Sequence, residues 1–271
     1  MSAILAEKKH LFSCWDRLKG QIRDKIIILF LDFDGTLAPI VEKTGLAALP
    51  EETRKVLEKL SRSPCFRIAV VSGRMLADLK QKMNIPHITY VGNHGYEIEG
   101  PDINFRGLIP PSMNEAMGFI RENLNGKLAS IPGVHIEDKG ITLSLHYRSA
   151  DPENFKLIKR IFNNTCKPYL KNNQITVKSG KMVFEIRPPV VWDKGKAVLW
   201  LLNKWKRVLG GDNVFPVCIG DDVTDEDAFK VLKGKGVTVR VGQERDTAAE
   251  YYLGNQEEIN QLLSLFLESA A

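Results

Sequence analysis

Residues 25–36, Lys-Ile-Ile-Ile-Leu-Phe-Leu-Asp-Phe-Asp-Gly-Thr, join an unbroken apolar run to two aspartates. The apolar part, 26–31, begins with three β-branched isoleucines, which is typical of a strand buried on both faces. Strands of that kind occur in parallel sheets, and the ligands of such sheets bind at the carboxyl edge. Asp32 and Asp34 follow the run directly. The stretch therefore predicts a parallel sheet with an acidic site at the end of one strand.

Helix and strand patterns alternate on both sides of this stretch, as in a parallel sheet with covering helices. The helices expected there cover 3–19, 50–61, 74–83, 193–208, 225–233 and 256–268, and the strands cover 25–31, 67–71, 88–91, 214–219 and 237–241. Between 108 and 189 the order changes to helix-strand-strand-helix-strand-strand, which favours an antiparallel sheet with helices on one face. The sequence predicts an α/β protein in which a Rossmann-like parallel-sheet core, 1–107 and 190–271, is interrupted by an inserted α+β cap domain, 108–189.

Composition and charge narrow the class of protein. The 271 residues carry a net charge of +5, but lysines and arginines are dispersed, so nucleic acid is not an expected partner. The longest apolar stretch near the amino terminus, 26–31, is far short of the roughly 20 residues of a membrane helix. No signal-peptide core precedes it, and no membrane partner is expected. The scattered cysteines lack metal-ligand spacing, which indicates buried free thiols and a cytoplasmic location.

A second acidic run follows a later predicted strand. Gly220-Asp-Asp-Val-Thr-Asp225 comes directly after an apolar run that ends at Ile219. Carboxylates at two strand ends repel each other unless a cation lies between them, and an oxygen-only donor set favours magnesium over zinc. Taken alone, the first run also fits an Asx-type turn and the second a helix cap. Taken together, the two runs predict a magnesium site.

Two further segments offer groups that bind phosphate. Ser72-Gly-Arg74 follows the strand at 67–71 and opens a helix, where a hydroxyl and backbone N–H groups are available to an anion. Lys194 lies at the start of the helix at 193–208, where its ammonium group can bind a phosphoryl oxygen and offset the charge of Asp32. Lys196 is an alternative for that role, and either lysine alone also fits a solvated surface.

These four segments, in this order, resemble the motifs of the haloacid dehalogenase superfamily of phosphatases. Asp32-Phe-Asp-Gly-Thr36 is similar to its first motif, Ser72 to its second, Lys194 to its third and Gly220–Asp225 to its fourth. The resemblance implies the fold of that superfamily and a phosphoryl transfer through an aspartyl-phosphate on Asp32. Dehalogenases of the superfamily usually lack the second acid of the first motif, so Asp34 favours phosphatase chemistry.

The resemblance also implies a role for each matching residue. Asp32 is the expected nucleophile, and Asp34 is the expected acid and base, which protonates the leaving alcohol and then activates water. Ser72 and Lys194 are expected to hold the charge of the transferring phosphoryl group. The expected cofactor is Mg²⁺, and its expected ligands are Asp32, Asp34 and Asp221. Asp222 and Asp225 are expected to support these ligands without binding the metal directly.

The inserted unit resembles that of the trehalose-6-phosphate phosphatase family. The resemblance rests on Gly92-Asn-His-Gly95, Leu145-His-Tyr-Arg148 and Lys181-Met-Val-Phe-Glu-Ile-Arg-Pro188. It implies hydrolysis of trehalose 6-phosphate in trehalose biosynthesis, with charged groups binding the sugar hydroxyls. The substrate-binding residues that it implies are Arg74, His94, Gly95, Glu137, Lys139, Arg148, Lys181 and Glu185. As alternatives, His94 organises its turn, and the charged residues of the insert form an ordinary solvated face.

Other functions agree with the same core motifs. One is a different sugar-phosphate phosphatase, acting on sucrose 6-phosphate or a mannosyl phosphate, and a less favoured one is a phosphomutase. A different class is a non-catalytic regulatory partner of a trehalose synthase, although such a role gives no reason to crowd acids at two strand ends. The expected partners are a small-molecule sugar phosphate and a trehalose-6-phosphate synthase.

Overall fold

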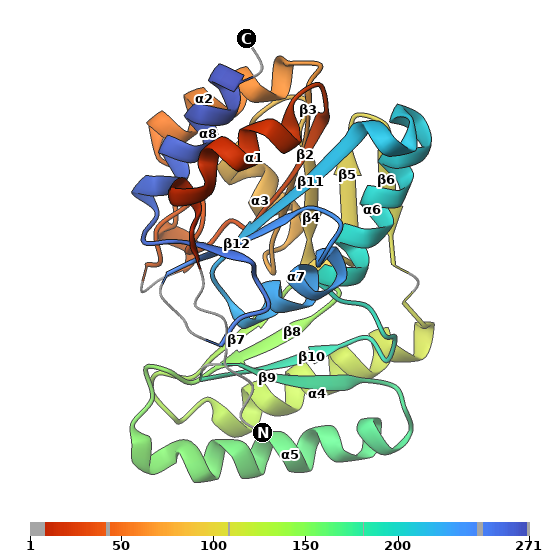
Figure 1. Cartoon of the computed structure of the whole chain (residues 1–271). Coiled ribbons are helices and arrows are strands. Elements are labelled where there is room, and N and C mark those ends of the chain that lie inside the picture. Colours follow the sequence, from red (N-terminus) through yellow and green to blue (C-terminus); the bar gives the residue numbers. More distant parts are fainter. Residues whose placement is uncertain (1–8, 42–43, 108, 181, 243–245, 270–271) are drawn as a thin grey trace, which may run out of the picture. The chain divides into compact units, whose positions relative to one another are not determined.

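The chain folds into two compact units, which Figure 1 shows in a computed structural model. The structure describes residues 9–41, 44–107, 109–180, 182–242 and 246–269. The larger unit comprises Met1–Arg106 and Trp192–Ala271, and the smaller unit comprises Gly107–Val191. The insert expected at 108–189 therefore falls within the smaller unit.

The described residues of the larger unit form one nine-stranded sheet. In the spatial order given below, the seven strands from β1 through β13, β12, β11, β2 and β3 to β4 are parallel, whereas β5 and β6 are antiparallel to their neighbours. In spatial order the strands are β1 (Lys9–His10), β13 (Tyr251–Leu253), β12 (Val237–Val241), β11 (Val214–Gly220), β2 (Ile26–Leu31), β3 (Phe66–Val71), β4 (Thr89–Gly92), β5 (Glu97–Gly100) and β6 (Ile103–Arg106). The central strands β11 and β2 bring the two predicted acidic runs to the same edge of the sheet.

Helices cover both faces of this sheet (Figure 1), which explains why β2 is apolar at every position. Ile27, Leu29 and Leu31 of β2 pack into the core on one face, while Ile28 and Phe30 pack into the core on the other. The first face is covered by α1 (Trp15–Ile22), α2 (Glu51–Arg62), α3 (Leu76–Met83) and α8 (Glu257–Ser269), and the second by α6 (Lys194–Leu209) and α7 (Glu226–Leu232). The predicted α/β fold with a parallel-sheet core is confirmed.

The smaller unit contains an antiparallel four-stranded sheet with its own apolar core. Its strands, in spatial order, are β7 (His135–Asp138), β8 (Leu143–His146), β10 (Val183–Arg187) and β9 (Thr176–Gly180). Two helices, α4 (Pro111–Leu128) and α5 (Phe155–Lys171), pack against one face of this sheet. The rings of Phe162 in α5 and Phe184 in β10 stack with centroids 4.5 Å apart. This is the predicted α+β arrangement.

The amino-terminal part differs from the expected helix at 3–19. Residues 1–8 lie outside the described ranges, and β1 and a 3-10 turn at Leu11–Cys14 precede α1, which continues to Ile22. The β1 strand forms because Lys9 and His10 pair in parallel with β13 at the sheet edge. Further 3-10 turns are Thr44–Leu46, Asn93–Gly95, Pro152–Asn154, Gly211–Asn213 and Val223–Asp225.

The structure bears on two expectations drawn from the composition, which concern the cysteines and membrane-spanning helices. All four cysteines are free thiols within the described ranges, but only Cys166 and Cys218 are buried, while Cys14 and Cys65 are half-buried. Burial raises the pKa of the Cys166 thiol to about 12, so it is held as an unreactive apolar group. Among the described helices, none combines the length and the apolar character that a bilayer-spanning segment requires.

Candidate active site

The turns after β2 and β11 fit against each other at the carboxyl edge of the sheet. The backbone N–H of Asp32 donates to the carbonyl of Ile219 (2.9 Å), which keeps the buried Asp32 side by side with the end of β11. Gly35 adopts a left-handed φ of +86°, and a Cβ at this position would lie 2.2 Å from Oδ2 of Asp221. The Thr36 hydroxyl donates to Oδ1 of Asp221 (3.1 Å). Only glycine at position 35 allows this close approach.

Lys194 is buried between two carboxylates of this edge. It is the first residue of α6, whose amino end is capped by Asp193, since Oδ1 of Asp193 accepts from the N–H of Lys196 (2.8 Å). The Lys194 Nζ donates to Oδ1 of Asp32 (2.5 Å) and to Oδ1 of Asp225 (2.9 Å). Of the two lysines that the sequence offers for this place, the structure brings Lys194 to the acids, and Lys196 is half-buried.

Asp32, Asp221 and Asp225 form an acidic cluster in which one oxygen of each lies within 4.8 Å of the others. When all three are ionised, three negative charges face the single positive charge of Lys194, and two remain unbalanced. Oxygen donors with an unbalanced double charge suit a hard divalent cation. The donor set therefore fits a site for such an ion.

Burial and mutual repulsion disturb the titration of these acids. Burial raises the pKa of Asp32 well above its usual range, and although Lys194 opposes this, Asp225 and Asp221 raise it further. Burial, together with repulsion from Asp225, raises the pKa of Asp221 to about 6. A divalent cation would favour the ionised forms, because a bound cation is the largest local charge in such a site.

The carboxylate of Asp34 lies outside the acidic cluster. Arg74 binds both of its oxygens, with Nη2 2.5 Å from Oδ1 and Nε 2.7 Å from Oδ2. The same guanidinium donates through Nη1 to Asp78 (2.7 Å) and lies over the ring of Phe33, 5.3 Å from its centroid. The structure thus brings the predicted acid and base, Asp34, to the predicted substrate ligand Arg74.

The remaining predicted residues of the larger unit surround the turn after β3. Ser72 accepts at Oγ from the N–H of Arg74 (3.1 Å), and its carbonyl accepts from the N–H of His94 (3.0 Å). The His94 ring lies against Gly73, where a Cβ would approach Cε1 to 2.5 Å. The carbonyl of Gly95 accepts from the indole of Trp192 (2.8 Å). His94 therefore packs on the Ser72 turn, in agreement with the organising role left open by its sequence.

Asp222 and Asp225 differ in their placement. Asp225 is buried, contributes to the acidic cluster and accepts at Oδ2 from the N–H of Asp222 (3.0 Å). Asp222 is exposed, and its side chain takes part in the capping box of the turn at Val223–Asp225. Sequence reasoning had set Asp225 behind the metal ligands and had given no role to Asp78. The Asp78 contact has a detectable signal, since Arg74 and Asp78 are four residues apart in the segment predicted as a helix, although in the structure Arg74 lies two residues before α3.

In the smaller unit, charged residues gather on the sheet face that α4 and α5 leave uncovered. The Lys139 Nζ lies 3.8 Å from Oε2 of Glu137 and 3.9 Å from Oε1 of Glu185. His146, which sequence reasoning missed, contacts Glu137 at 3.0 Å. Arg148 is exposed two residues beyond β8, and Lys181 lies outside the described residues. Three of the five residues predicted here are therefore close together.

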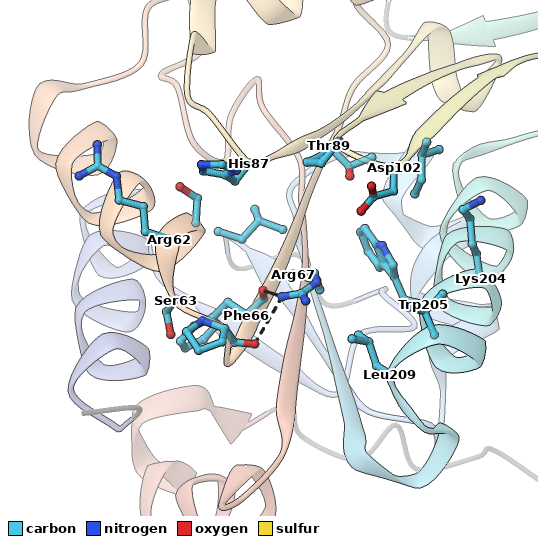
Figure 2. Close-up of a pocket in the computed structure, with 16 residues that line it drawn as sticks. Arg62, Ser63, Phe66, Arg67, His87, Thr89, Asp102, Lys204, Trp205 and Leu209 are labelled. Atoms are coloured by element: carbon cyan, nitrogen blue, oxygen red, sulfur yellow. Dashed lines mark hydrogen bonds between the residues drawn. The ribbon is translucent and has the colours of Figure 1, made fainter.

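A cavity of about 490 Å³ lies at the opposite edge of the larger sheet, near the amino ends of β3 and β4 (Figure 2). Its basic residues have local roles. Arg62 belongs to the last turn of α2, where a cation offsets the helix dipole. Arg67 donates to the carbonyl of Phe66 (2.7 Å), and Lys204 lies 5.8 Å from the ring centroid of Trp200. The cavity shares no lining residue with the predicted site in the described part of the chain.

Comparison with known proteins agrees with the geometry of this edge. Residues 30–257 match the family model described as trehalose-phosphatase, which is most of the chain. The chain belongs to the trehalose-phosphatase family. The resemblance predicted from the four motifs and the insert is thereby confirmed.

One relative and two solved structures are similar to this chain over most of its length. Trehalose-phosphate phosphatase B of Arabidopsis thaliana is 35% identical over 270 residues, which cover 94% of this chain and 70% of that protein. A C-terminal domain of trehalose-6-phosphate phosphatase from Candida albicans has a TM-score of 0.79 at 24% identity and covers 97% of this chain and 99% of its own. The C-terminal domain of the Candida albicans trehalose synthase regulatory protein has a TM-score of 0.68 at 15% identity, over 97% and 100% of the two chains. These two structures share the fold.

Proposed function

We propose that this protein hydrolyses trehalose 6-phosphate to trehalose and phosphate, with Asp32 as the nucleophile. The observation that carries the proposal is the buried contact of Lys194 with Asp32 (2.5 Å) and Asp225 (2.9 Å) in a chain of the trehalose-phosphatase family. The ammonium group opposes the effect of burial on the pKa of Asp32 and, together with a bound divalent cation, would favour the ionised, nucleophilic carboxylate. The reaction would be the second step of trehalose synthesis.

In the proposed first step, Asp32 attacks the phosphorus of the substrate. Lys194 holds Oδ1, which leaves Oδ2 to form the new bond to phosphorus. The bond between phosphorus and the sugar oxygen breaks, and Asp34 gives a proton to that oxygen so that trehalose leaves as a neutral alcohol. The products of this step are free trehalose and a phosphoryl group on Asp32.

In the proposed second step, water attacks the phosphorus of the aspartyl-phosphate. The ionised Asp34 accepts a proton from this water, the bond between phosphorus and Asp32 breaks, and phosphate is released with Asp32 restored. Arg74 holds Asp34 through two contacts of 2.5 and 2.7 Å, so a phosphate bound by Arg74 would compete with Asp34 for the guanidinium. This competition would release Asp34 for proton transfer when substrate is present.

We propose Mg²⁺ as the cation of the acidic cluster. Asp32, Asp221 and Asp225 would hold it, whereas Asp34, which the sequence also predicts as a ligand, gives both of its carboxylate oxygens to Arg74. Bound there, the cation would offset the charge of the phosphoryl oxygens. Asp222 supports the arrangement through its N–H, which donates to Asp225 (3.0 Å).

The phosphate would be oriented by the turn after β3 and the sugar by the smaller unit. Ser72, Arg74, His94 and Gly95 lie around that turn and are the groups that we propose for the phosphate end of the substrate. Charged groups form strong hydrogen bonds to hydroxyls and reject analogues that lack them. For the sugar hydroxyls we propose the charged residues of the smaller unit: Glu137, Lys139, Arg148, Lys181 and Glu185.

The alternatives differ in what they require of these groups. A phosphatase for sucrose 6-phosphate or a mannosyl phosphate would use the same edge of the larger sheet, so only substrate preference separates it. A non-catalytic regulatory role is compatible with the fold, which the regulatory domain from Candida albicans shares. It gives no reason, however, to bury Asp32 and Asp225 around Lys194, an arrangement that is costly without a function.

A panel of sugar phosphates tests the proposed function. Phosphate release from trehalose 6-phosphate, sucrose 6-phosphate and a mannosyl phosphate is measured with magnesium and with a chelator. We expect kcat/KM for trehalose 6-phosphate to exceed the others by at least about tenfold, since hydroxyl recognition discriminates strongly. A higher kcat/KM for another sugar phosphate would identify that compound as the substrate. The absence of magnesium-dependent turnover of any ester would favour the regulatory role.

Two further assignments belong to this proposal. A trehalose-6-phosphate synthase is the protein partner that we propose, because it would supply the substrate. The cytoplasm is the location that we propose, and the four free cysteines support it, since free thiols are typical of reducing compartments. Co-purification with a synthase and fractionation of cells test these two assignments.

A further inference from the structure

The face of the smaller sheet opposite α4 and α5 contains two rows of side chains that lie next to each other. In the first row His135 pairs with His146, and in the second Glu137 pairs with Ser144. Side chains alternate between the two faces of a strand, so the residue between His146 and Ser144, Leu145, belongs to the apolar core on the other face. His146 and Glu137 are therefore diagonal neighbours on one face of the sheet.

Contacts on this face fix one oxygen of Glu137. The Nε2 of His146 lies 3.0 Å from Oε2 of Glu137, and the Nζ of Lys139 lies 3.8 Å from the same oxygen. The ring of His135 stacks on that of His146, with centroids 6.2 Å apart and an angle of 22° between the planes. Among the described residues both of these contacts go to Oε2, so Oε1 of Glu137 can accept a hydrogen bond from a ligand.

We infer that His146 is a positioning residue, which orients Glu137 to accept a hydrogen bond from a hydroxyl of the sugar. The inference rests on the proposed function and adds to it a residue outside the predicted set. A carboxylate that is already held in one orientation loses less conformational freedom when the sugar binds, so affinity increases. His146 acts in binding alone, and the steps at Asp32 do not involve it.

The charge of Glu137 agrees with this role. Burial opposes its ionisation, but the hydrogen bond from His146, together with the charge of Lys139, lowers the pKa of Glu137 below its usual value. Glu137 is thus an ionised acceptor, and hydrogen bonds to ionised acceptors are stronger than those to neutral groups. Glu185 is held in a similar way, since the Nε of Arg187 donates to its Oε2 (2.8 Å) and Lys139 lies near its Oε1.

Kinetic constants of three single variants of the full chain test the inference. His146→Leu removes the hydrogen bond at similar volume, and we expect KM for trehalose 6-phosphate to rise about tenfold with kcat within about twofold. His146→Gln retains an N–H donor of similar reach and restores KM to within about threefold of wild type. His135→Leu, which removes the stacked ring and a weaker electrostatic effect on Glu137 but no hydrogen bond to it, is the matched control, with KM within about twofold.

A double variant separates a positioning role from an independent one. Glu137→Gln raises KM by itself, and adding His146→Leu to it leaves KM unchanged within about twofold if His146 acts through Glu137. Additive effects in the double variant, or an equal rise in KM for His135→Leu and His146→Leu, would overturn the inference. So would a normal KM in Glu137→Gln. Wild-type preference for another sugar phosphate is a different outcome, which overturns the proposed function instead.

Discussion

Lys194 has an environment that a surface lysine does not have. Its side chain is 3% exposed, and the two carboxylates that it contacts, Asp32 and Asp225, are 7% and 4% exposed. The pKa of Lys194 is raised above its usual value because these carboxylates outweigh the effect of burial. At neutral pH the ammonium group is therefore charged. It is the counter-charge that offsets the cost of burying the carboxylates of Asp32 and Asp225.

Replacing Lys194 tests this dependence. Lys194→Met should lower the free energy of unfolding by about 3–5 kcal/mol, because it leaves buried carboxylates without a counter-charge, and it should reduce kcat at least about a hundredfold. The exposed Lys230 of α7 provides the matched control, and Lys230→Met should stay within about 0.5 kcal/mol of wild type. Urea denaturation and phosphate release measure both effects. Equal losses in the two variants would contradict the role given to Lys194.

Gly35 is a second residue with a sharp steric requirement. Gly35→Ala should destabilise the protein by at least about 1 kcal/mol and weaken magnesium-dependent activity, because φ is +86° and the new Cβ would displace the Asp221 carboxylate. The control is Gly20→Ala in α1, where nothing lies within 4 Å of the added Cβ, so a helical alanine should stabilise by up to about 1 kcal/mol. Thermal unfolding and phosphate release distinguish them. Normal activity in Gly35→Ala would show that Asp221 tolerates displacement.

At this scale the sequence predicts which acids meet, but not how each side chain turns. Asp32 and Asp221 follow neighbouring parallel strands, and topology alone brings such residues to one edge. Asp34 and Asp225 lie in turns, where the direction of a side chain depends on its partners. Arg74 holds Asp34 outside the acidic cluster, while Lys194 holds Asp225 inside it. Neither contact has a sequence signal, because the residues are far apart in the chain.

The acids at the ends of β2 and β11 should make the free energy of unfolding depend on pH and, if the proposed Mg²⁺ binds there, on magnesium. The pKa of Asp221 rises from 3.8 to about 6 on folding, so the folded state binds more protons than the unfolded state between these values. The free energy of unfolding without metal should therefore fall as pH rises through this window, by about 3 kcal/mol for Asp221. Bound magnesium requires ionised acids, so it should stabilise more at high pH.

Urea denaturation at pH 5 and pH 7.5, with a chelator and with magnesium, checks this expectation. The magnesium-induced rise in the midpoint should be larger at pH 7.5 than at pH 5. The matched control is Asp221→Asn, which removes one ionisable ligand and should reduce the difference between the two pH values. A magnesium effect that is the same at both pH values would mean that these acids do not bind the ion.

The sequence predicts the long helices and strands, but it does not predict the short strands at the edges of the sheet. The apolar runs of β2 and β11 and the amphipathic pattern of α2 have a period that predicts their structure. In contrast, β1 and β13 have two and three residues, which pair only because a neighbouring strand end is available. The β5–β6 hairpin was also missed, although Gly100-Pro-Asp102 between its strands is a readable turn signal.

The whole molecule is divided into two units with separate cores, which predicts separate folding. Residues 107–191, produced alone, should unfold cooperatively in urea, because their apolar core and their four-stranded sheet are internal to the unit. Phe162→Ala should unfold this fragment, since loss of a buried phenylalanine costs about 3–5 kcal/mol. Circular dichroism measures both. A fragment without a cooperative transition would contradict the independence of its core.

The division itself follows from the sequence because the rhythm of elements changes from strand-helix to helix-strand-strand. The charged face of the smaller unit follows only in part. Glu137, Lys139 and Glu185 are residues that the resemblance implies, and they lie close together, whereas His146 was not implied although it stands within the quoted segment Leu145–Arg148. Nothing in its spacing indicates that it contacts Glu137, because the register of β7 and β8 decides which residues are diagonal neighbours.

The covalent role of Asp32 is the central claim, and mass spectrometry of the acid-quenched enzyme tests it most directly. The full chain is mixed with trehalose 6-phosphate and magnesium, quenched during turnover and digested. We expect one phosphoryl group on the peptide that contains Asp32 in the wild type, and neither this adduct nor turnover in Asp32→Asn. A phosphoryl group on another residue, or normal turnover by Asp32→Asn, would contradict the account.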